Sequence, residues 1–99
     1  MLAFDTSKKA IGKRMRQLRK GYGLKQEDMA EALGITGGAL SSIETGRNHP
    51  STLTAMVAWQ KYGAPLEWLL AGVETTLSDK LRERLAHGPP SSSEGEPSS

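Results

Sequence analysis

The sequence predicts an all-α protein, and three observations support this fold class. Apolar residues recur three or four positions apart in several segments, which is the spacing that places them on one face of a helix. Glycines and prolines stand between these segments, where they end one helix or begin the next. No segment alternates apolar and polar residues with the period of two that a half-buried strand shows. We therefore expect helices joined by short turns and no sheet.

Length and composition bound the size and class of the protein. The 99 residues predict one small domain, and 36% hydrophobic residues suffice for a modest core. A chain of this size buries roughly 60% of its unfolded surface, so we expect marginal stability unless it dimerises. The lack of cysteine excludes a disulfide framework and a thiolate metal site, and it favours a cytoplasmic location. We see no signal peptide and no run of ~18 apolar residues, and so expect no membrane partner.

The net charge of +2 is unevenly distributed along the chain. Residues 1–49 carry nine lysines and arginines against five acids, a net charge of +4, whereas residues 50–99 carry four against six, a net charge of −2. Clustered positive charge favours a polyanionic partner. Lysines and arginines that merely solvate a helix surface explain the same numbers, so charge alone leaves both interpretations open.

The central feature is a pair of short helices joined by a tight turn. One helix is expected over residues 26–33 and the next over 37–45, each with apolar residues on one face. Gly34 breaks the first helix, Thr36 can cap the second, and Gly46 ends it. Helices this short are not stable alone in water, because nucleation is unfavourable. They need a platform, which we expect the rest of the chain to supply.

Three further helices form the expected platform, over residues 7–20, 52–62 and 65–71. We expect Trp59 and Trp68 to be core residues rather than the walls of a ligand pocket. The stripe expected to be buried on the helix at 52–62 consists of Ala55, Met56, Trp59 and Tyr62.

The sequence predicts a possible sixth helix over residues 78–87. Its single apolar stripe consists of Leu77, Leu81 and Leu85. A stripe this thin either packs on the domain or pairs with its twin in a dimer, and both alternatives remain open. Residues 88–99 contain no apolar residue, so we expect a disordered, flexible tail or hinge there.

The order of these segments resembles a known family. Two stretches, IGKRMRQLRKGYGLKQEDMAEALGITGGALSSIETGRNHPS and LEWLLAG, are similar to the helix-turn-helix DNA-binding domain of the lambda-type phage repressors and the xenobiotic-response-element regulators. The match covers about residues 8–72. It depends on Arg19, Gln26, Ala30, Gly34, Ile43, Glu44 and Gly46 at consistent spacing. The resemblance implies an all-α, five-helix lambda-repressor-like domain over residues 1–73, followed by a short linker and possible extra helix over 74–87.

The resemblance implies structural roles for four of these residues. Ala30 lies where the two short helices cross, and a larger side chain would push them apart. Gly34 takes a left-handed conformation that costs a residue with a Cβ atom about 1 kcal/mol. Arg19 and Glu44 are the family's charged pair, which orients the third helix and reads no bases.

The resemblance also implies that the third helix, residues 36–45, enters the major groove of double-stranded DNA. The base-reading positions are then Thr36, Gly37, Gly38, Ala39, Ser41 and Ser42. Better-known repressors often carry Gln, Arg or Asn here, whereas the two glycines have no side chain and lower helix propensity by roughly 1 kcal/mol each. Three interpretations remain: close approach of the glycine backbone, contacts from the alanine methyl and the serines, or weak direct readout with DNA shape, water and dimer geometry supplying specificity. We favour a combination of the last two.

A second set of residues is expected to contact DNA phosphates. Its members are Gln26, Lys25, Arg47, Asn48, Lys13 and Arg14. Gln26 opens a helix whose N-terminal amides attract an anion, and Lys25 replaces the capping Ser or Thr of the family with a positive charge. If several phosphates are neutralised, affinity should fall steeply with salt.

The function that these features predict is a sequence-specific DNA-binding transcriptional regulator of the phage-repressor type, bound as a homodimer to a palindromic operator. Trp68, Leu81 and Leu85 are the dimer candidates, because an exposed tryptophan is a good interface anchor. The alternative is a DNA-binding antitoxin, although the tail has too few apolar residues to wrap a toxin. We expect no enzyme, no cofactor or metal and no small-molecule ligand. His49 and His87 show no metal-ligand spacing, and no phosphate-binding loop is present.

Overall fold

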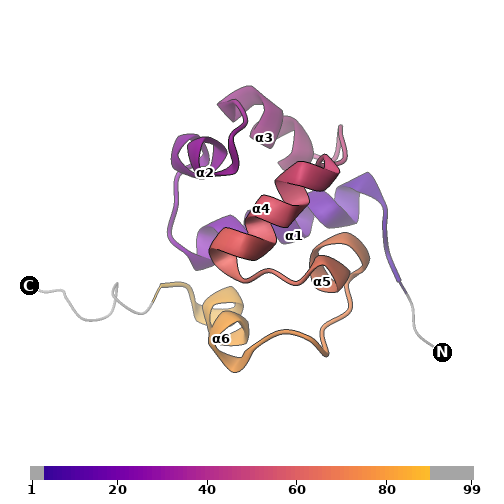
Figure 1. Cartoon of the computed structure of the whole chain (residues 1–99), viewed down its shortest axis with the longest axis vertical. Coiled ribbons are helices and arrows are strands. Elements are labelled where there is room, and N and C mark those ends of the chain that lie inside the picture. Colours follow the sequence, from indigo (N-terminus) through magenta and orange to yellow (C-terminus); the bar gives the residue numbers. More distant parts are fainter. Residues whose placement is uncertain (1–3, 90–99) are drawn as a thin grey trace, which may run out of the picture.

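The computed structural model describes residues 4–89, which form six helices and no strand (Figure 1). In chain order they are α1 (Lys8–Gly21), α2 (Gln26–Leu33), α3 (Gly37–Glu44), α4 (Thr52–Tyr62), α5 (Leu66–Ala71) and α6 (Asp79–His87). The predicted all-α fold class is confirmed, and the possible sixth helix is present. Apart from Gly88 and Pro89, the predicted flexible tail lies outside the described residues.

Hydroxyl side chains cap the start of four helices. Each accepts a hydrogen bond from the backbone amide three residues later, at 3.0 to 3.2 Å. The capping residues are Ser7, Thr36, Ser51 and Ser78. Such caps satisfy amides that the first turn of a helix leaves unpaired. At the start of α2, Lys25 occupies the capping position and its side chain makes no such bond.

α1 is the platform on which the other helices assemble, since it packs against α3, α5 and α6. Gly12 allows the contact with α3, because a Cβ atom there would lie 2.2 Å from the carbonyl oxygen of Ile43. Gly21 allows the contact with α6 in the same way, because its Cβ would lie 2.9 Å from the carbonyl oxygen of Arg84. Both glycines are therefore packing positions, a role that apolar periodicity does not reveal.

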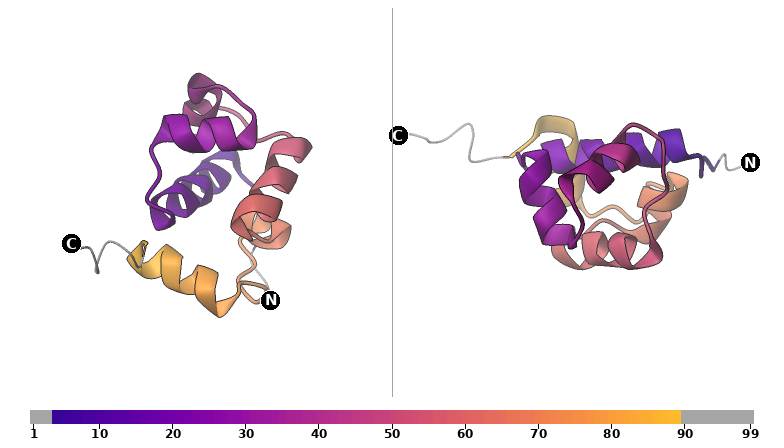
Figure 2. Two further views of the ribbon diagram at one scale, coloured as in Figure 1. Left: turned by 60° about the vertical axis from the view of Figure 1, so that its left-hand side comes forward. Right: turned by 90° about the horizontal axis from the view of Figure 1, so that it is seen from above.

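The core lies between α1 and the short helices, so that α2 and α3 gain the support that their length requires. Its largest fully buried side chains are Met15, Leu18, Met29, Leu40 and Leu69. α3 and α6 lie at opposite ends of the molecule, and α4 runs along one side (Figures 1 and 2). None of the helices within residues 4–89 is long and apolar enough to cross a membrane.

The thin apolar stripe predicted for the sixth helix left two alternatives, packing on the domain or pairing with its twin in a dimer. In the structure, α6 packs on the domain. Leu77 and Leu81 are buried, and the guanidinium carbon of Arg84 lies 4.3 Å from the centre of the Tyr22 ring. The same ring lies 5.0 Å from that of Tyr62, so that α1, α4 and α6 meet there. Leu81 is therefore a core residue and not a dimer contact, and Leu85 is partly buried against the same core.

The two tryptophans differ in their environment. Trp68 is 2% exposed, so its predicted role as a dimer anchor is wrong and its core position is correct. Trp59 is 53% exposed and Met56 is 45% exposed, so the prediction that α4 buries both is wrong. The side of α4 that is buried consists of Thr54, Ala55 and Ala58. These small residues let the helix backbone approach the core closely, and the larger side chains project from the opposite side.

Candidate nucleic-acid interface

The turn between α2 and α3 has a fixed geometry. Gly34 has φ +75° and ψ +27°, the left-handed conformation that glycine adopts without strain. The amide of Ile35 donates to the carbonyl oxygen of Ala30 at 2.9 Å, and Thr36 accepts from the amide of Ala39 at 3.0 Å. Ala30 is 1% exposed and lies in the core shared by the two helices. α3 therefore leaves α2 at a defined angle.

A buried carboxylate anchors the far end of α3. Arg19 Nε lies 2.8 Å from Glu44 Oε2, and Arg19 Nη2 donates to Glu44 Oε1 at 3.1 Å. The Glu44 side chain is only 3% exposed. Gln26 Nε2 donates to Glu44 Oε1 at 3.0 Å, and Arg19 Nη1 donates to the carbonyl oxygen of Leu24 at 2.9 Å. Arg19, Gln26 and Glu44, which we call the Glu44 cluster, thus connect α1, the start of α2 and the end of α3.

The outer side of α3 is uncovered within the described part of the chain. We call it the α3 edge: Thr36, Gly37, Gly38, Ala39, Ser41, Ser42 and Thr45. Its first turn is largely exposed, whereas the two serines are half-buried. Thr45, which sequence reasoning missed, is exposed one helical turn after the serines, and its hydroxyl donates to the carbonyl oxygen of Ser41 at 2.9 Å. Ala39 faces the following loop, where it lines a hollow of about 200 Å³ with Asn48 and His49.

Neither glycine of the first turn is required by the fold. Gly37 and Gly38 both have negative φ, so the backbone does not demand glycine there. A Cβ atom added at either position would meet no other atom within 4 Å. By contrast, a Cβ atom at Gly12 would clash with the backbone of α3. The described fold therefore gives no reason for the paired glycines, and close approach of DNA to this backbone stays an interpretation.

The loop after α3 brings a cationic segment beside the α3 edge. Gly46 has φ +82°, and a Cβ atom there would lie 3.1 Å from the Cα atom of Lys9, so the start of α1 adjoins this loop. His49 Nε2 lies 3.2 Å from the carbonyl oxygen of Thr6, which joins the same two segments. Arg47 is exposed, and its side chain has no hydrogen-bond or ion-pair partner within residues 4–89. Lys9 was missed by sequence reasoning, since its place beside Gly46 depends on the α1–α3 packing.

Arg14 has a structural role that corrects the predicted phosphate contact. Its Nε donates to the carbonyl oxygen of Leu69 at 3.0 Å, and its Nη2 donates to the carbonyl oxygen of Asp5. Burial lowers the pKa of Arg14, and the nearby Asp5 carboxylate opposes that shift. The guanidinium thus joins the N-terminal segment to α5. Lys13 lies on the exposed side of α1 and remains a candidate.

The start of α2 is more mixed in charge than the resemblance suggests. Lys25 is exposed beside the first turn, but the turn itself carries the exposed acids Glu27 and Asp28. These carboxylates are stabilised by the helix dipole and oppose an incoming phosphate. The Gln26 amide is also held by Glu44. A phosphate contact at this helix start therefore depends on Lys25 and on the backbone amides.

The rigid turn, the buried Glu44 cluster and the uncovered α3 edge together define a helix-turn-helix module of the phage-repressor type. A family model described as a helix-turn-helix domain matches residues 12–75, and the chain belongs to that family.

Two curated relatives are named as a transcriptional regulator and a transcriptional repressor. The chain is 41% identical over 61 residues to the HTH-type transcriptional regulator DdrOP3 of Deinococcus deserti, a match that covers 62% of this chain and 47% of that protein. It is 28% identical over 72 residues to the cryptic phage CTXphi transcriptional repressor RstR of Vibrio cholerae, covering 73% of this chain and 65% of that protein. The chain thus spans about half to two thirds of the length of these relatives.

Solved structures show the same fold. The P22 c2 repressor, crystallised in complex with a synthetic operator, superposes with a TM-score of 0.61 at 22% identity, over 66% of this chain and 98% of that chain. The restriction-modification controller protein C.AhdI from Aeromonas hydrophila gives a TM-score of 0.57 at 24% identity, over 63% and 94% of the two chains.

Proposed function

We propose that this chain is the DNA-binding module of a sequence-specific transcriptional repressor that binds a palindromic operator as a homodimer. The observation that carries the proposal is the combination of a rigidly held α3 with an edge that nothing in the described chain covers. The names of the relatives support it, since RstR is a transcriptional repressor and the P22 c2 repressor was solved with an operator.

In this proposal the α3 edge lies in the major groove and the flanking cations lie on the phosphates. Thr36, Ser41 and Ser42 supply hydroxyls that hydrogen-bond to base edges or phosphates, and Ala39 supplies a methyl group for a thymine methyl. The charged contacts come from exposed cations on α1, at the start of α2 and in the loop after α3, with Asn48 as a neutral phosphate contact. These cations are Lys9, Lys13, Lys25 and Arg47.

The sparse chemistry of the α3 edge has a consequence for specificity. No long polar side chain of the arginine or glutamine type stands on it, so bidentate base contacts of that kind are absent from this edge. We infer that one subunit discriminates weakly between bases. Specificity then depends on DNA shape and on two half-sites being bound together.

Selection of bound DNA from a random pool tests the proposal. We expect a two-fold-related consensus whose half-sites lie about one helical turn apart, ~34 Å. The Arg19→Met variant, which releases the end of α3, serves as the matched comparison and should lose the consensus while retaining weak, salt-sensitive binding. Binding by the natural chain without sequence preference at moderate salt would contradict the proposal.

A further inference from the structure

A row of exposed cations runs along the outer side of α1. Lys9, Lys13, Arg16 and Lys20 follow one another four, three and four residues apart, the spacing that places side chains on one side of a helix. All four are exposed, and none has a side-chain hydrogen bond or ion pair within residues 4–89. We call these residues the α1 stripe. At a rise of about 1.5 Å per residue it extends about 16 Å.

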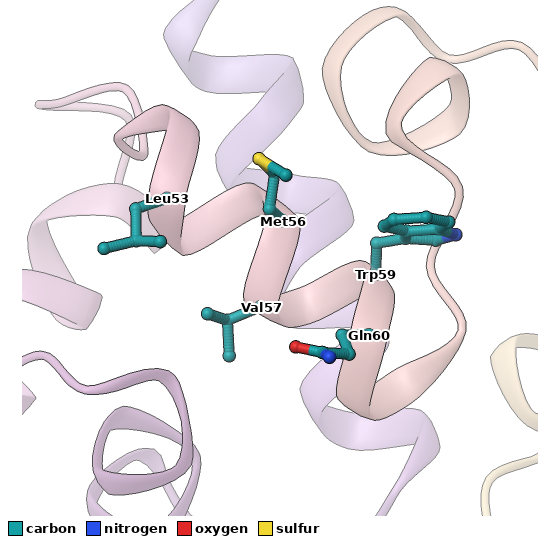
Figure 3. A pocket seen from close by; sticks show the side chains of 5 residues that line it. All are labelled: Leu53, Met56, Val57, Trp59 and Gln60. Atoms are coloured by element: carbon teal, nitrogen blue, oxygen red, sulfur yellow. The ribbon is translucent and has the colours of Figure 1, made fainter.

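The charge of the α1 stripe exceeds what a solvated helix needs. α1 carries seven lysines and arginines among its 14 residues and no acid, so like charges repel one another along the stripe. α4, on the opposite side of the molecule (Figure 2), has one charged residue, Lys61, and exposes the apolar side chains of Leu53, Met56 and Trp59 (Figure 3). Solvent contact therefore does not account for the row of cations, whereas a bound polyanion would neutralise their repulsion.

The α1 stripe is continuous with the proposed DNA contact. Its first member, Lys9, adjoins the loop after α3, because a Cβ atom at Gly46 would lie 3.1 Å from the Lys9 Cα atom. Gly12 packs α1 directly against the end of α3, so the stripe begins beside the α3 edge. The other three cations of the stripe line a hollow of about 440 Å³ together with Gln17. A strand of DNA that leaves α3 beside Lys9 therefore meets further positive charge along α1.

We propose that the α1 stripe binds the sugar–phosphate backbone of the DNA that flanks the half-site contacted by α3. The inference rests on the proposed function, because it needs DNA held at the α3 edge. Phosphates of one strand recur about every 3.4 Å along B-DNA, so the stripe spans about five of them. Lys9 and Lys13 lie nearest the half-site, and Arg16 and Lys20 add contacts to the flank.

Contacts of this kind set affinity and not base preference. Lysine and arginine bind phosphates of any sequence, so the flank itself is not read directly. DNA that bends toward α1 brings more phosphates within reach of Arg16 and Lys20. Flanks that bend easily should therefore bind more tightly than stiff flanks, although no base in them is contacted.

The length of the DNA tests the proposal. The duplex selected from the random pool is prepared in two forms, one that ends at the edge of the operator and one extended by about ten base pairs of mixed sequence at each end, roughly one helical turn. We expect the natural chain to bind the extended form about tenfold more tightly at low salt. The slope of log affinity against log salt should be steeper by about two units per subunit, because two more phosphates are neutralised.

The double variant Arg16→Ala with Lys20→Ala should bind the short duplex as the natural chain does and gain little from the extension. Lys61→Ala, which removes an exposed lysine from α4, is the matched control and should keep the full gain. Circular dichroism confirms that each variant is folded. An equal gain for the natural chain and the double variant would overturn the proposal. A natural chain that gains nothing from the flank would also overturn it, and would leave the stripe to solvent or to an acidic protein.

DNA cleavage by a tethered iron chelate supplies a second measurement. The chain has no cysteine, so Gln17→Cys carries a single chelate beside the stripe without removing a cation. The matched control is Gln60→Cys, at an exposed glutamine of α4 (Figure 3). We expect Gln17→Cys to cut the flank within about five base pairs of the operator edge, and Gln60→Cys to leave it intact. Cuts confined to the operator, or equal cutting of the flank by both, would overturn the proposal.

These outcomes are separable from those of the proposed function. A chain that selects an operator but shows neither the gain from the flank nor the cuts in it contradicts the α1 stripe alone. A random pool that yields no consensus contradicts the proposed function and overturns this inference with it.

Discussion

The Glu44 carboxylate connects the end of α3 to α1 and to the start of α2. It is almost fully buried and receives hydrogen bonds from Arg19 and Gln26. A buried charge is tolerated only when it is paired and hydrogen-bonded, because desolvation otherwise disfavours it strongly. Replacing both partners together by apolar residues changes the free energy of unfolding little. Removing one partner leaves the other as an uncompensated buried charge.

Arg19→Met should therefore lower the free energy of unfolding by about 3 kcal/mol, because it leaves Glu44 buried without its cation. Urea unfolding followed by tryptophan fluorescence, to which the buried Trp68 contributes, measures the change. The double variant Arg19→Met with Glu44→Leu is the control, and it should recover most of the loss. If the double variant were as unstable as the single one, the uncompensated charge would not be the cause.

Gly38→Ala separates stability from function at the α3 edge. A methyl group there meets open space, so it should raise the free energy of unfolding by about 0.5–1 kcal/mol through helix propensity. If the backbone lies against DNA, the same methyl group should weaken binding. Thermal unfolding and a DNA titration, performed on one preparation, measure both effects. A destabilised protein would show that glycine is required by the fold after all.

Arg47→Ala tests the phosphate role of the loop after α3. Removal of one phosphate contact should weaken binding to all sequences similarly, and should reduce the slope of log affinity against log salt by about one unit. Lys80→Ala, which removes an exposed cation from α6 at the opposite end of the molecule, is the matched control. Equal slopes for Arg47→Ala and the natural chain would reject this contact.

At the scale of elements, α6 is part of the domain rather than an appendage. It contacts α1 through Gly21, covers Tyr22 with Arg84, and buries Leu81. A helix of nine residues is not stable alone, so these contacts are what keeps it folded.

Leu81→Ala should accordingly destabilise the whole domain, by about 2–4 kcal/mol, because it leaves a cavity beneath α6. Chemical denaturation measures the loss, and Ala86→Gly, an exposed change in the same helix, is the control. The control should cost no more than about 1 kcal/mol, from helix propensity alone. An unaffected Leu81→Ala variant would mean that α6 detaches readily from the domain.

The elements also show which features a sequence can predict. The six helices and the turn at Gly34 were predictable, because periodicity and glycine chemistry act locally. The buried side of α4 was not, because α4 has two plausible stripes and the larger apolar residues suggest the wrong one. Ala55 and Ala58 form the buried side because small residues permit close helix packing.

Contacts distant in sequence limit the prediction of the site in a similar way. The pairing of Arg19 with Glu44 came only through the resemblance to a family. The structural role of Arg14 depends on the carbonyl oxygen of Leu69, which is 55 positions away. The place of Lys9 beside Gly46 depends on how closely Gly12 lets α1 approach α3. None of these is encoded in a local pattern.

At the scale of the whole molecule, α3, α4 and α6 form three separate surfaces. α3 lies at one end, α6 lies at the other, and α4 runs along the side between them (Figure 2). On α4 the apolar side chains of Leu53, Met56 and Trp59 are exposed. The uneven charge of the chain follows this division, since the net positive half contains α1, α2 and α3. The proposed DNA contact at α3 thus leaves the side along α4 uncovered.

A nuclear magnetic resonance titration of the natural chain with its selected DNA tests most directly whether α3 and the loop after it contact DNA. We expect the largest changes in backbone amide shifts on residues 36–49, which comprise the α3 edge and the loop after it. Amides of α6 should shift little, because α6 lies at the opposite end of the molecule. Unchanged amide shifts over residues 36–49 in a protein that bound DNA through another surface would contradict a DNA interface at α3.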